Sequence, residues 1–568
     1  MRKFGLILFG LVIIGSMLLA ACQPAAEAPA AEAPAAEAPA AEAPVEEAPA
    51  EEAPVVEESV VDEKMGGTFY WTESAIVQFD PPLINDDASF HVASLVHVFL
   101  FRFILDDVGS PTVIPELAKS WDFEEDGKII VFHLNEGWTF QDGNDIFAEG
   151  EGREITADDV VYSIDRMVTL EGTKAPSDLV SGFESVEALD KYTVKLTMKE
   201  PDAVLFSGGR GLTSAAILPK EAVEARGGDW GLNPIGGGPF EFIEYVADDH
   251  VTLRRNEDFA IPAFLDEVFF RIIPDQDVQM ISLEAGEIDR TALPAEEFDR
   301  FENDPDYKLY AANCPYSYNI IFDLKNELFQ DILVREAIAH AIDGRAIMKN
   351  QFGGMAVPGC GIAGPGIPGH DPDLCDLFAF DPALTDELMV QAGWTKNAAG
   401  IWEKDGQTFT FDFEVWNMSP MPIIATAATT QMQEAGFDVN LVTVEFGTWI
   451  EDALGENTQK PMMSWSGFCG EGGMNSYWGR SGLGRGWGFD DEEIFTMLDQ
   501  ANTMLVDPEL RQTTLQEAHR KIYSTYINIP LGFATGYEIT TARVEDWAVT
   551  MWFAKLVSTV NNVWLSSK

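Results

Sequence analysis

Residues 138–167 read WTFQDGNDIFAEGEGREITADDVVYSIDRM, and this stretch indicates the fold class. Thr156 and Asp159 have the spacing of a hydroxyl cap and an acid three residues later, which predicts a helix that VVYSIDRM continues. On either side, Lys128–Leu134 (KIIVFHL) and Tyr192–Met198 (YTVKLTM) alternate and are rich in β-branched residues, so both predict strands. A capped helix between two strands indicates an α/β fold.

The same mixture of elements continues along the chain. Leu333–Met348 places its apolar side chains on one face of a predicted helix, and Asp490–Leu505 and Glu509–Tyr526 predict two more amphipathic helices. Pro234–Phe240 (PIGGGPF) predicts a turn that leads into the strand-like FEFIEYV. The body from Met65 to Lys568 is too long for one ordinary core, so we expect at least two lobes. A hydrophobic content of 46% excludes disorder for most of it.

The N-terminus carries a targeting signal. Arg2 and Lys3 precede an apolar run from Phe4 to Ala21 that ends Leu-Ala-Ala-Cys, the order of a secretory signal peptide. A cysteine at the first mature position resembles the lipobox of bacterial lipoproteins. We therefore expect residues 1–22 to be a lipoprotein signal peptide and Cys22 to carry lipid. The alternative is a transmembrane anchor, since about 18 apolar residues can span a bilayer. Both interpretations place the body outside the cytoplasm, at a membrane.

Residues 23–64 predict a disordered tether. A five-residue unit ending Glu-Ala-Pro recurs six times, with prolines from Pro29 to Pro54. A proline every fifth residue prevents a long helix, and the repeated glutamates keep the segment extended at roughly 3 Å per residue. A low-complexity tail without a role is the alternative, but the position between an anchor and a body favours a spacer.

The formal net charge is −58, from 94 acidic and 36 basic residues. Such a surface repels nucleic acid and anionic lipid headgroups, so neither is an expected partner. We interpret the acids as a solvated coat in preference to a cation-binding surface.

Cysteines and histidines argue against metal and catalytic chemistry. The four body cysteines lack the spacing of a zinc site. The seven histidines form no HExxH motif, and the sequence has no GxSxG serine elbow. PIGGGPF lacks the lysine of a phosphate loop. We predict no enzyme, no metal and no cofactor. The four cysteines allow three disulfide pairings; Cys360 with Cys375 would staple a Gly/Pro-rich loop, and Cys314 with Cys469 would close one of about 150 residues.

An ordered series of motifs resembles one family, the solute-binding proteins of oligopeptide and dipeptide ABC importers. Asp142-Gly143 and Thr156–Arg166 carry the match to the family signature, with an insertion around Ile146–Arg153. The series continues as NPIGGGPFEFIEY, RRNEDF, LEAGEID, DILVREAIAHAIDGRAI, DELMVQAGW and the stretch from Gly488 to Trp547. The resemblance therefore spans nearly the whole body in order.

The resemblance implies a two-lobe periplasmic-binding-protein type II fold that closes on ligand about a hinge. The expected domains are lobe I with an extra subdomain at 65–312, lobe II at 313–530 and a return to lobe I at 531–568. It also implies a monomeric, extracytoplasmic, lipid-anchored receptor that captures peptides and delivers them to ABC permease subunits. Nickel and haem roles are known in the wider family, and the histidine placement gives them little support.

The resemblance also implies site residues. Oligopeptide binders have a disulfide between the positions of Cys314 and Cys469, and an aspartate that binds the peptide amino terminus where this chain has Glu471. Glu471 keeps the carboxylate with one more methylene; a loop acid that faces solvent is the alternative. The arginines that bind the far end of the ligand have no match in PMMSWS, and Arg480 and Arg485 are the nearest bases in sequence.

Aromatic residues crowd the segment from Trp449 to Trp487, and flat rings also stack on sugars, so an oligosaccharide receptor of the same family is the alternative function. About half of these rings are expected in the core. Besides Glu471, the expected ligand-lining residues are Phe446, Trp465, Phe468, Asn85, Asp86 and Phe533.

Overall fold

The computed structural model describes residues 63–566 except 85, 106–110, 151, 176, 207–210, 312–315, 358, 455–459, 467–471, 549–555 and 558–561. The predictions for the signal peptide, the tether and Cys22 lie outside these residues. So do those for Asn85, Cys314, Phe468, Cys469 and Glu471. Within the described part, no helix combines the length and the apolar character needed to cross a bilayer.

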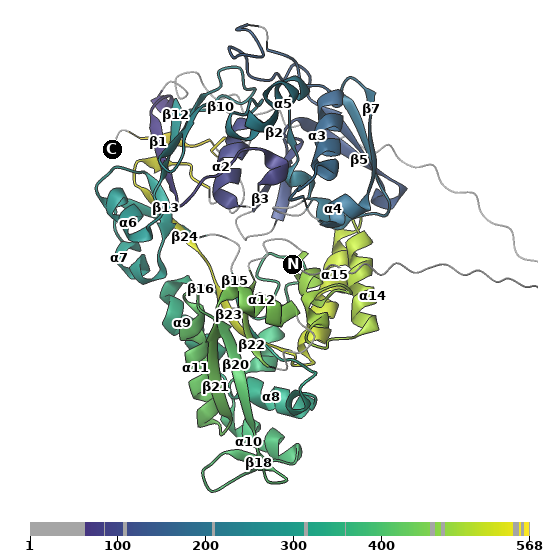
Figure 1. Ribbon diagram of the computed structural model, residues 1–568, viewed down its shortest axis with the longest axis vertical. Helices are drawn as coiled ribbons and strands as arrows, with labels where there is room; N and C mark the ends of the chain where they lie inside the picture. Colours follow the sequence, from purple (N-terminus) through teal and green to yellow (C-terminus); the bar gives the residue numbers. More distant parts are fainter. Residues whose placement is uncertain are drawn as a thin grey trace, which may run out of the picture. The chain divides into compact units, whose positions relative to one another are not determined.

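Three sheets organise the described chain, with helices packed against them (Figure 1). The first has seven described strands, in the order β10 (Phe240–Val246), β11 (His250–Arg255), β12 (Glu267–Ile272), β1 (Thr68–Glu73), β13 (Arg290–Leu293), β24 (Tyr537–Thr541) and β14 (Tyr307–Ala311). The second has six, in the order β16 (Ala356–Val357), β23 (Asn528–Ala534), β15 (Tyr316–Ile321), β22 (Met462–Ser466), β20 (Thr410–Trp416) and β21 (Asp438–Val444). The third has four, in the order β5 (Ala118–Glu124), β6 (Ile129–Leu134), β8 (Thr193–Met198) and β7 (Phe183–Asp190).

The helices divide among these sheets. The first and third sheets are accompanied by α2 (Asp87–Val96), α3 (Ala157–Thr169), α4 (Ser177–Gly182), α5 (Lys220–Arg226), α6 (Gln276–Glu284) and α7 (Phe298–Phe301). The segments around the six-stranded sheet form α8 (Ile332–His340), α9 (Gly344–Phe352), α10 (Pro382–Gln391), α11 (Met421–Glu434), α12 (Phe446–Leu454), α13 (Gly472–Trp478), α14 (Glu492–Thr503) and α15 (Pro508–Tyr523). The short strands are β2 (Val98–Phe99), β3 (Phe101–Leu105), β4 (Pro111–Pro115), β9 (Ala216–Ile217), β17 (Thr395–Lys396), β18 (Trp402–Lys404), β19 (Gln407–Thr408), β25 (Val544–Glu545) and β26 (Trp564–Leu565).

Three hydrophobic clusters lie in the described part of the chain, and the largest is shared by two sheets. Phe132 and Ile164 belong to the cluster between the four-stranded sheet and α3, whereas Phe69 and Leu253 belong to that of the seven-stranded sheet. The largest cluster surrounds the six-stranded sheet, includes Phe413, and extends to β13 and β24 of the seven-stranded sheet. The core is therefore continuous between the six-stranded sheet and part of the seven-stranded sheet. The α/β prediction is confirmed.

Most elements predicted from the pattern are present, and one is wrong. The predicted strands appear as β6 and β8, and the capped helix as α3, where the Thr156 N–H donates to Asp159 Oδ2 at 2.8 Å. The single helix expected over Leu333–Met348 is instead two helices, α8 and α9. Asp343 causes the break, because its side chain accepts the backbone N–H of Ala346 at 2.9 Å and starts α9 as a new N-cap.

The chain passes between the seven-stranded and six-stranded sheets at two places. β14 leads to β15 through residues 312–315, and β23 leads to β24 through Thr535 and Gly536. The boundary expected at 530/531 falls inside β23. We therefore propose that lobe II ends at Thr535–Gly536, where the chain changes sheet.

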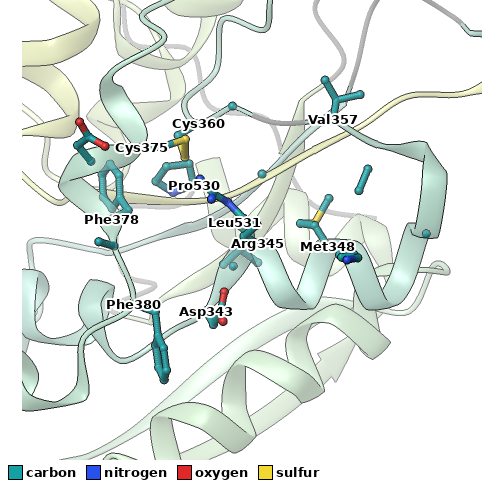
Figure 2. Close-up of a pocket in the computed structure, with 18 residues that line it drawn as sticks. Asp343, Arg345, Met348, Val357, Cys360, Cys375, Phe378, Phe380, Pro530 and Leu531 are labelled. Atoms are coloured by element: carbon teal, nitrogen blue, oxygen red, sulfur yellow. A yellow bond between two sulfur atoms is a disulfide. The ribbon is translucent and has the colours of Figure 1, made fainter.

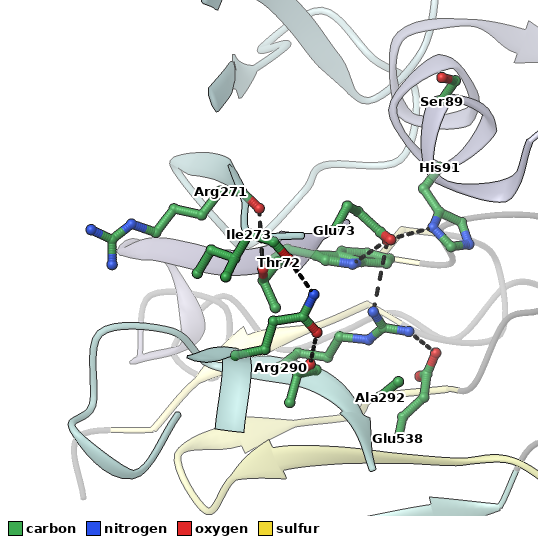
Figure 3. Close-up of polar contacts among 12 residues, drawn as sticks. Thr72, Glu73, Ser89, His91, Arg271, Ile273, Arg290, Ala292 and Glu538 are labelled. Carbon is green, nitrogen blue, oxygen red and sulfur yellow. Dashed lines mark hydrogen bonds and ion pairs between the residues drawn. The ribbon is translucent and has the colours of Figure 1, made fainter. Parts of the chain in front are cut away.

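A buried ionic network fastens β24 to its neighbours (Figure 3). The Arg290 guanidinium forms ion pairs with Glu538 of β24 and with Glu73 of β1. Glu73 also accepts hydrogen bonds from His91 Nδ1 and Trp71 Nε1, each at 2.8 Å. Burial by itself raises the pKa of Glu73, but His91 and Arg290 outweigh it and hold that pKa below its usual value. The returning strand is thus held by charges that are shielded from water.

Candidate functional site

The carboxyl ends of three strands meet at one edge of the six-stranded sheet. β20 runs parallel to both β21 and β22, with Trp416 opposite Val444 and Glu414 opposite Met462. Their last residues are therefore at the same edge of the sheet. In open α/β sheets, ligands bind beyond the carboxyl ends of the strands, so this edge is the first place to look for a site.

Both chain crossings also lie at this edge. β15 is antiparallel to β22, with Ser317 opposite Ser466, and antiparallel to β23, with Tyr316 opposite Ala534. β15 therefore begins, and β23 ends, where β22 ends. We call the set Trp416, Val444, Ser466, Tyr316 and Ala534 the carboxyl edge. A ligand bound there lies beside the connections through which the two sheets are joined.

Phe446 lies just beyond the carboxyl edge, at the start of α12, and its side chain is 51% exposed. Its ring is stacked on Trp449, with centroids 6.2 Å apart and planes at 9°, and it meets the edge of Trp416 at 5.8 Å. The Nε1 atoms of Trp416 and Trp449 are buried and have no hydrogen-bond partner among the described residues. We call these three rings the Phe446 platform, in which Phe446 is exposed and both tryptophans are buried.

Trp416 is a residue that the sequence analysis missed. It is buried and ends the apolar strand TFDFEVW, a pattern that indicates a core position. Only the parallel pairing of β20 with β21 brings it next to Phe446. Trp465 lies on β22 opposite Tyr318, but its side chain is outside what the structure describes.

The other expected ligand residues with described side chains have structural roles. Phe533 is fully buried on β23, and a Cβ added to Gly359 would lie 2.8 Å from its ring, so no space for a ligand remains between them. Asp86 caps α2, where its Oδ1 accepts the Ser89 N–H at 2.7 Å. In this conformation Phe533 does not reach solvent, and Oδ1 of Asp86 is already used as a helix cap.

Tyr316 links the start of α2 to the carboxyl edge electrostatically. Burial raises the pKa of the Tyr316 hydroxyl, and the nearby negative charge of Asp87 raises it further. The first turn of α2, which Asp86 caps, is therefore close enough to the edge to influence its ionisation.

Arg480 and Arg485 do not supply a free base. Arg480 pairs with Glu492 at 2.8 Å and with Asp499 at 3.2 Å, and Arg485 pairs with Asp490. The predicted amine anchor Glu471 is not described. In sequence it follows β22 closely and directly precedes α13. Among the described residues, no cluster of three or more His, Cys, Asp or Glu side chains could hold a metal ion.

Cys360 and Cys375 form a disulfide in the structure, with 5.1 Å between their Cα atoms. The bond closes the Gly/Pro-rich loop that the sequence suggested it would staple. The pairing of Cys314 with Cys469 remains a prediction.

Comparison with known families decides the class. The middle region of the bacterial extracellular solute-binding proteins, family 5, matches residues 112–485. The chain belongs to this family. The dipeptide-binding protein of Escherichia coli K12 is 27% identical over 437 residues, which cover 71% of this chain and 76% of that protein. Heme-binding protein A of Haemophilus influenzae is 24% identical over 512 residues, which cover 84% of this chain and 89% of that protein.

Solved structures agree on the fold. DppA, the ABC transporter-associated periplasmic binding protein of Helicobacter pylori, solved in complex with the peptide STSA, superposes with a TM-score of 0.67. At 21% identity, the match covers 90% of this chain and 100% of that one. The family 5 chain therefore has the two-lobe fold of these binding proteins, and the family consists of extracellular solute-binding proteins.

Proposed function

We propose that this family 5 protein captures short peptides at the carboxyl edge and delivers them to the permease of an ABC importer. One observation carries the proposal. The carboxyl ends of β20, β21 and β22 lie at the same edge of the sheet as both connections between the sheets. A solute there can contact both lobes and shift the population toward a closed form. The similarity to a dipeptide-binding protein over most of the chain supports peptides as that solute.

The chemistry of capture follows from the ligand. A peptide backbone can pair with protein backbone, and its side chains can occupy roomy pockets, so recognition depends on charge only at the two ends. In the proposal, Glu471 pairs with the ligand ammonium and the Phe446 platform covers an apolar side chain. Cys22 with its lipid, followed by the tether, keeps the receptor near its permease and raises the effective concentration.

An oligosaccharide is the second candidate ligand. The exposed face of Phe446, stacked on Trp449 at 9°, offers a flat apolar surface to which the C–H face of a sugar can bind. The two candidates differ in their need for charge, because a neutral sugar does not require Glu471.

Mass spectrometry of the ligand retained on purification tests the proposal, together with calorimetric titration of di- and tripeptides. We expect a peptide in the preparation. We also expect Glu471→Gln to weaken binding at least tenfold, because a charge-assisted hydrogen bond contributes about 1.5–3 kcal/mol. Glu493→Gln is the matched control, since Glu493 lies on α14 and is paired with Lys521 of α15. A retained sugar or tetrapyrrole, or unchanged peptide affinity in Glu471→Gln, contradicts the proposed anchor or ligand.

A further inference from the structure

A cavity lies in the part of the chain around the six-stranded sheet (Figure 2). It has a volume of about 810 Å³ and opens between α9, the 3₁₀ helix Leu374–Phe378 and the middle of β23. We call it the α9 pocket. None of its lining residues belongs to the carboxyl edge or the Phe446 platform. Its size is in the range that holds a small organic ligand.

The inner wall of the α9 pocket is apolar. It is formed by Met348, Val357, Phe378, Pro530, Leu531 and the disulfide between Cys360 and Cys375. At the rim Phe380 is 49% exposed, which is unusual for so large an apolar ring. The wall could therefore cover an apolar body, with Phe380 at the rim of the pocket.

Two bases line the same pocket from one helix. Arg345 and Lys349 are one turn apart on α9, a spacing that puts both side chains on one face. Both are exposed, and neither has a hydrogen bond or an ion pair with any described residue. Of the two acids that line the pocket, Asp343 is committed to capping α9, and Asp376 is exposed on the 3₁₀ helix. The chain has 94 acidic and 36 basic residues, so two unpaired bases one helical turn apart make this cavity locally positive on an acidic protein.

The pocket is built on tightly packed backbone. A Cβ added to Gly344 would lie 2.6 Å from the Leu531 carbonyl oxygen, so α9 rests directly on β23. A Cβ on Gly532 would lie 3.1 Å from Met348 Cγ. The disulfide fixes the opposite side. A preformed cavity loses little conformational entropy when it is filled, which favours binding.

We propose that the α9 pocket binds a small amphipathic carboxylate, whose anionic end pairs with Arg345 and Lys349 and whose apolar body packs against the inner wall, with Phe380 at the rim. No residue assigned to the proposed peptide site lines this pocket, although Ala356 of its lining pairs with Ala534 of the carboxyl edge. Because Pro530, Leu531 and Gly532 precede the crossing at Thr535–Gly536, a ligand in the pocket contacts the strand that leads to the other lobe.

The test uses the full chain and 4-phenylbutyrate as the probe, measured by equilibrium dialysis. We expect saturable binding that falls at least tenfold in the double variant Arg345→Gln, Lys349→Gln. The neutral amide 4-phenylbutyramide should bind the unaltered protein at least tenfold more weakly than the acid. Lys119→Gln with Lys220→Gln is the control, since it removes the same charge at exposed positions elsewhere. Phe380→Ala should lower the affinity several-fold without changing the urea midpoint.

Three results would overturn the proposal. They are the absence of saturable binding, equal affinity of the acid and its amide for the unaltered protein, and equal affinity of the Arg345/Lys349 variant and the control. Displacement of the probe by a saturating peptide, with Glu471→Gln reducing probe binding, would assign the probe to the peptide site and also count against the α9 pocket. The comparison of acid with amide needs no variant, so it holds even where a substitution impairs folding.

Discussion

His519 Nε2 accepts a hydrogen bond from the backbone N–H of Ile362 at 3.2 Å, while its Nδ1 donates to the Gly369 carbonyl at 2.9 Å. One neutral imidazole on α15 thus holds two points of the loop that the disulfide closes. A proton on Nε2 would place a donor against a donor. Burial also disfavours the charged imidazolium, and it lowers the pKa of His519 to about 4.

Stability should therefore decrease on acidification. The pKa of His519 is depressed in the folded state, so between pH 6.5 and about 4 the unfolded chain binds a proton that the folded chain does not. The contribution of neutral His519 to the free energy of unfolding is complete above pH 6.5. It should decrease by on the order of 3 kcal/mol as the pH falls to about 4. Urea unfolding at a series of pH values measures this slope.

His519→Asn should flatten that slope by about one proton, whatever it does to the absolute stability. Part of the slope should persist, because burial also lowers the pKa of His97 to about 4. His133→Gln is the control, since His133 lies near the surface beside Asp122. An unchanged slope in His519→Asn would show that the folded protein protonates His519 as readily as the unfolded chain does.

Arg290→Met should destabilise the protein strongly. The substitution leaves Glu538 and Glu73 buried without their cation, and breaking such a pair costs about 3–5 kcal/mol. Adding Glu538→Gln should recover part of the loss, because the amide removes one buried charge and can still accept from Trp547 Nε1. Arg271→Gln, at an exposed pair with Glu287, should change the free energy of unfolding by less than about 1 kcal/mol. Equal effects at Arg290 and Arg271 would contradict a buried network.

Substitutions at Asp86 separate its two possible roles. Asp86→Ala removes the cap of α2 and should lower the free energy of unfolding by about 1 kcal/mol. Asp86→Asn keeps a good cap and removes the charge, so it should leave stability nearly unchanged. Titration of peptide into Asp86→Asn then reports on ligand contact alone. Unchanged affinity identifies Asp86 as a structural residue, and a tenfold loss restores it to the site.

Local patterns predicted most elements of the fold. Thr156 with Asp159 marked the start of α3, and alternation in KIIVFHL marked β6, because capping and burial on one face act over a few residues. The single helix expected over Leu333–Met348 was wrong for a local reason as well. Its apolar spacing continued through Asp343, whose side chain could equally cap a new helix.

The site was harder to predict because it depends on strands that are far apart in sequence. Trp416 and Phe446 come together only through the parallel register of β20 and β21, and Trp416 alone has the pattern of a core residue. Phe533 was expected at a cleft because of its position on the returning strand, but it is covered by the segment at Gly359. The α9 pocket has no sequence signature, since its two bases and its apolar wall come from three separate segments.

The link between β23 and β24 is only two residues long, Thr535 and Gly536, and the Thr535 N–H is held by the Met355 carbonyl at 2.9 Å. Successive side chains of a strand point to opposite faces, so inserting or deleting one residue here would exchange the two faces of one of the two strands. Glu538 would then turn away from Arg290, or Phe533 out of its core. The length of this link therefore fixes the side-chain orientation of strands in two sheets at once.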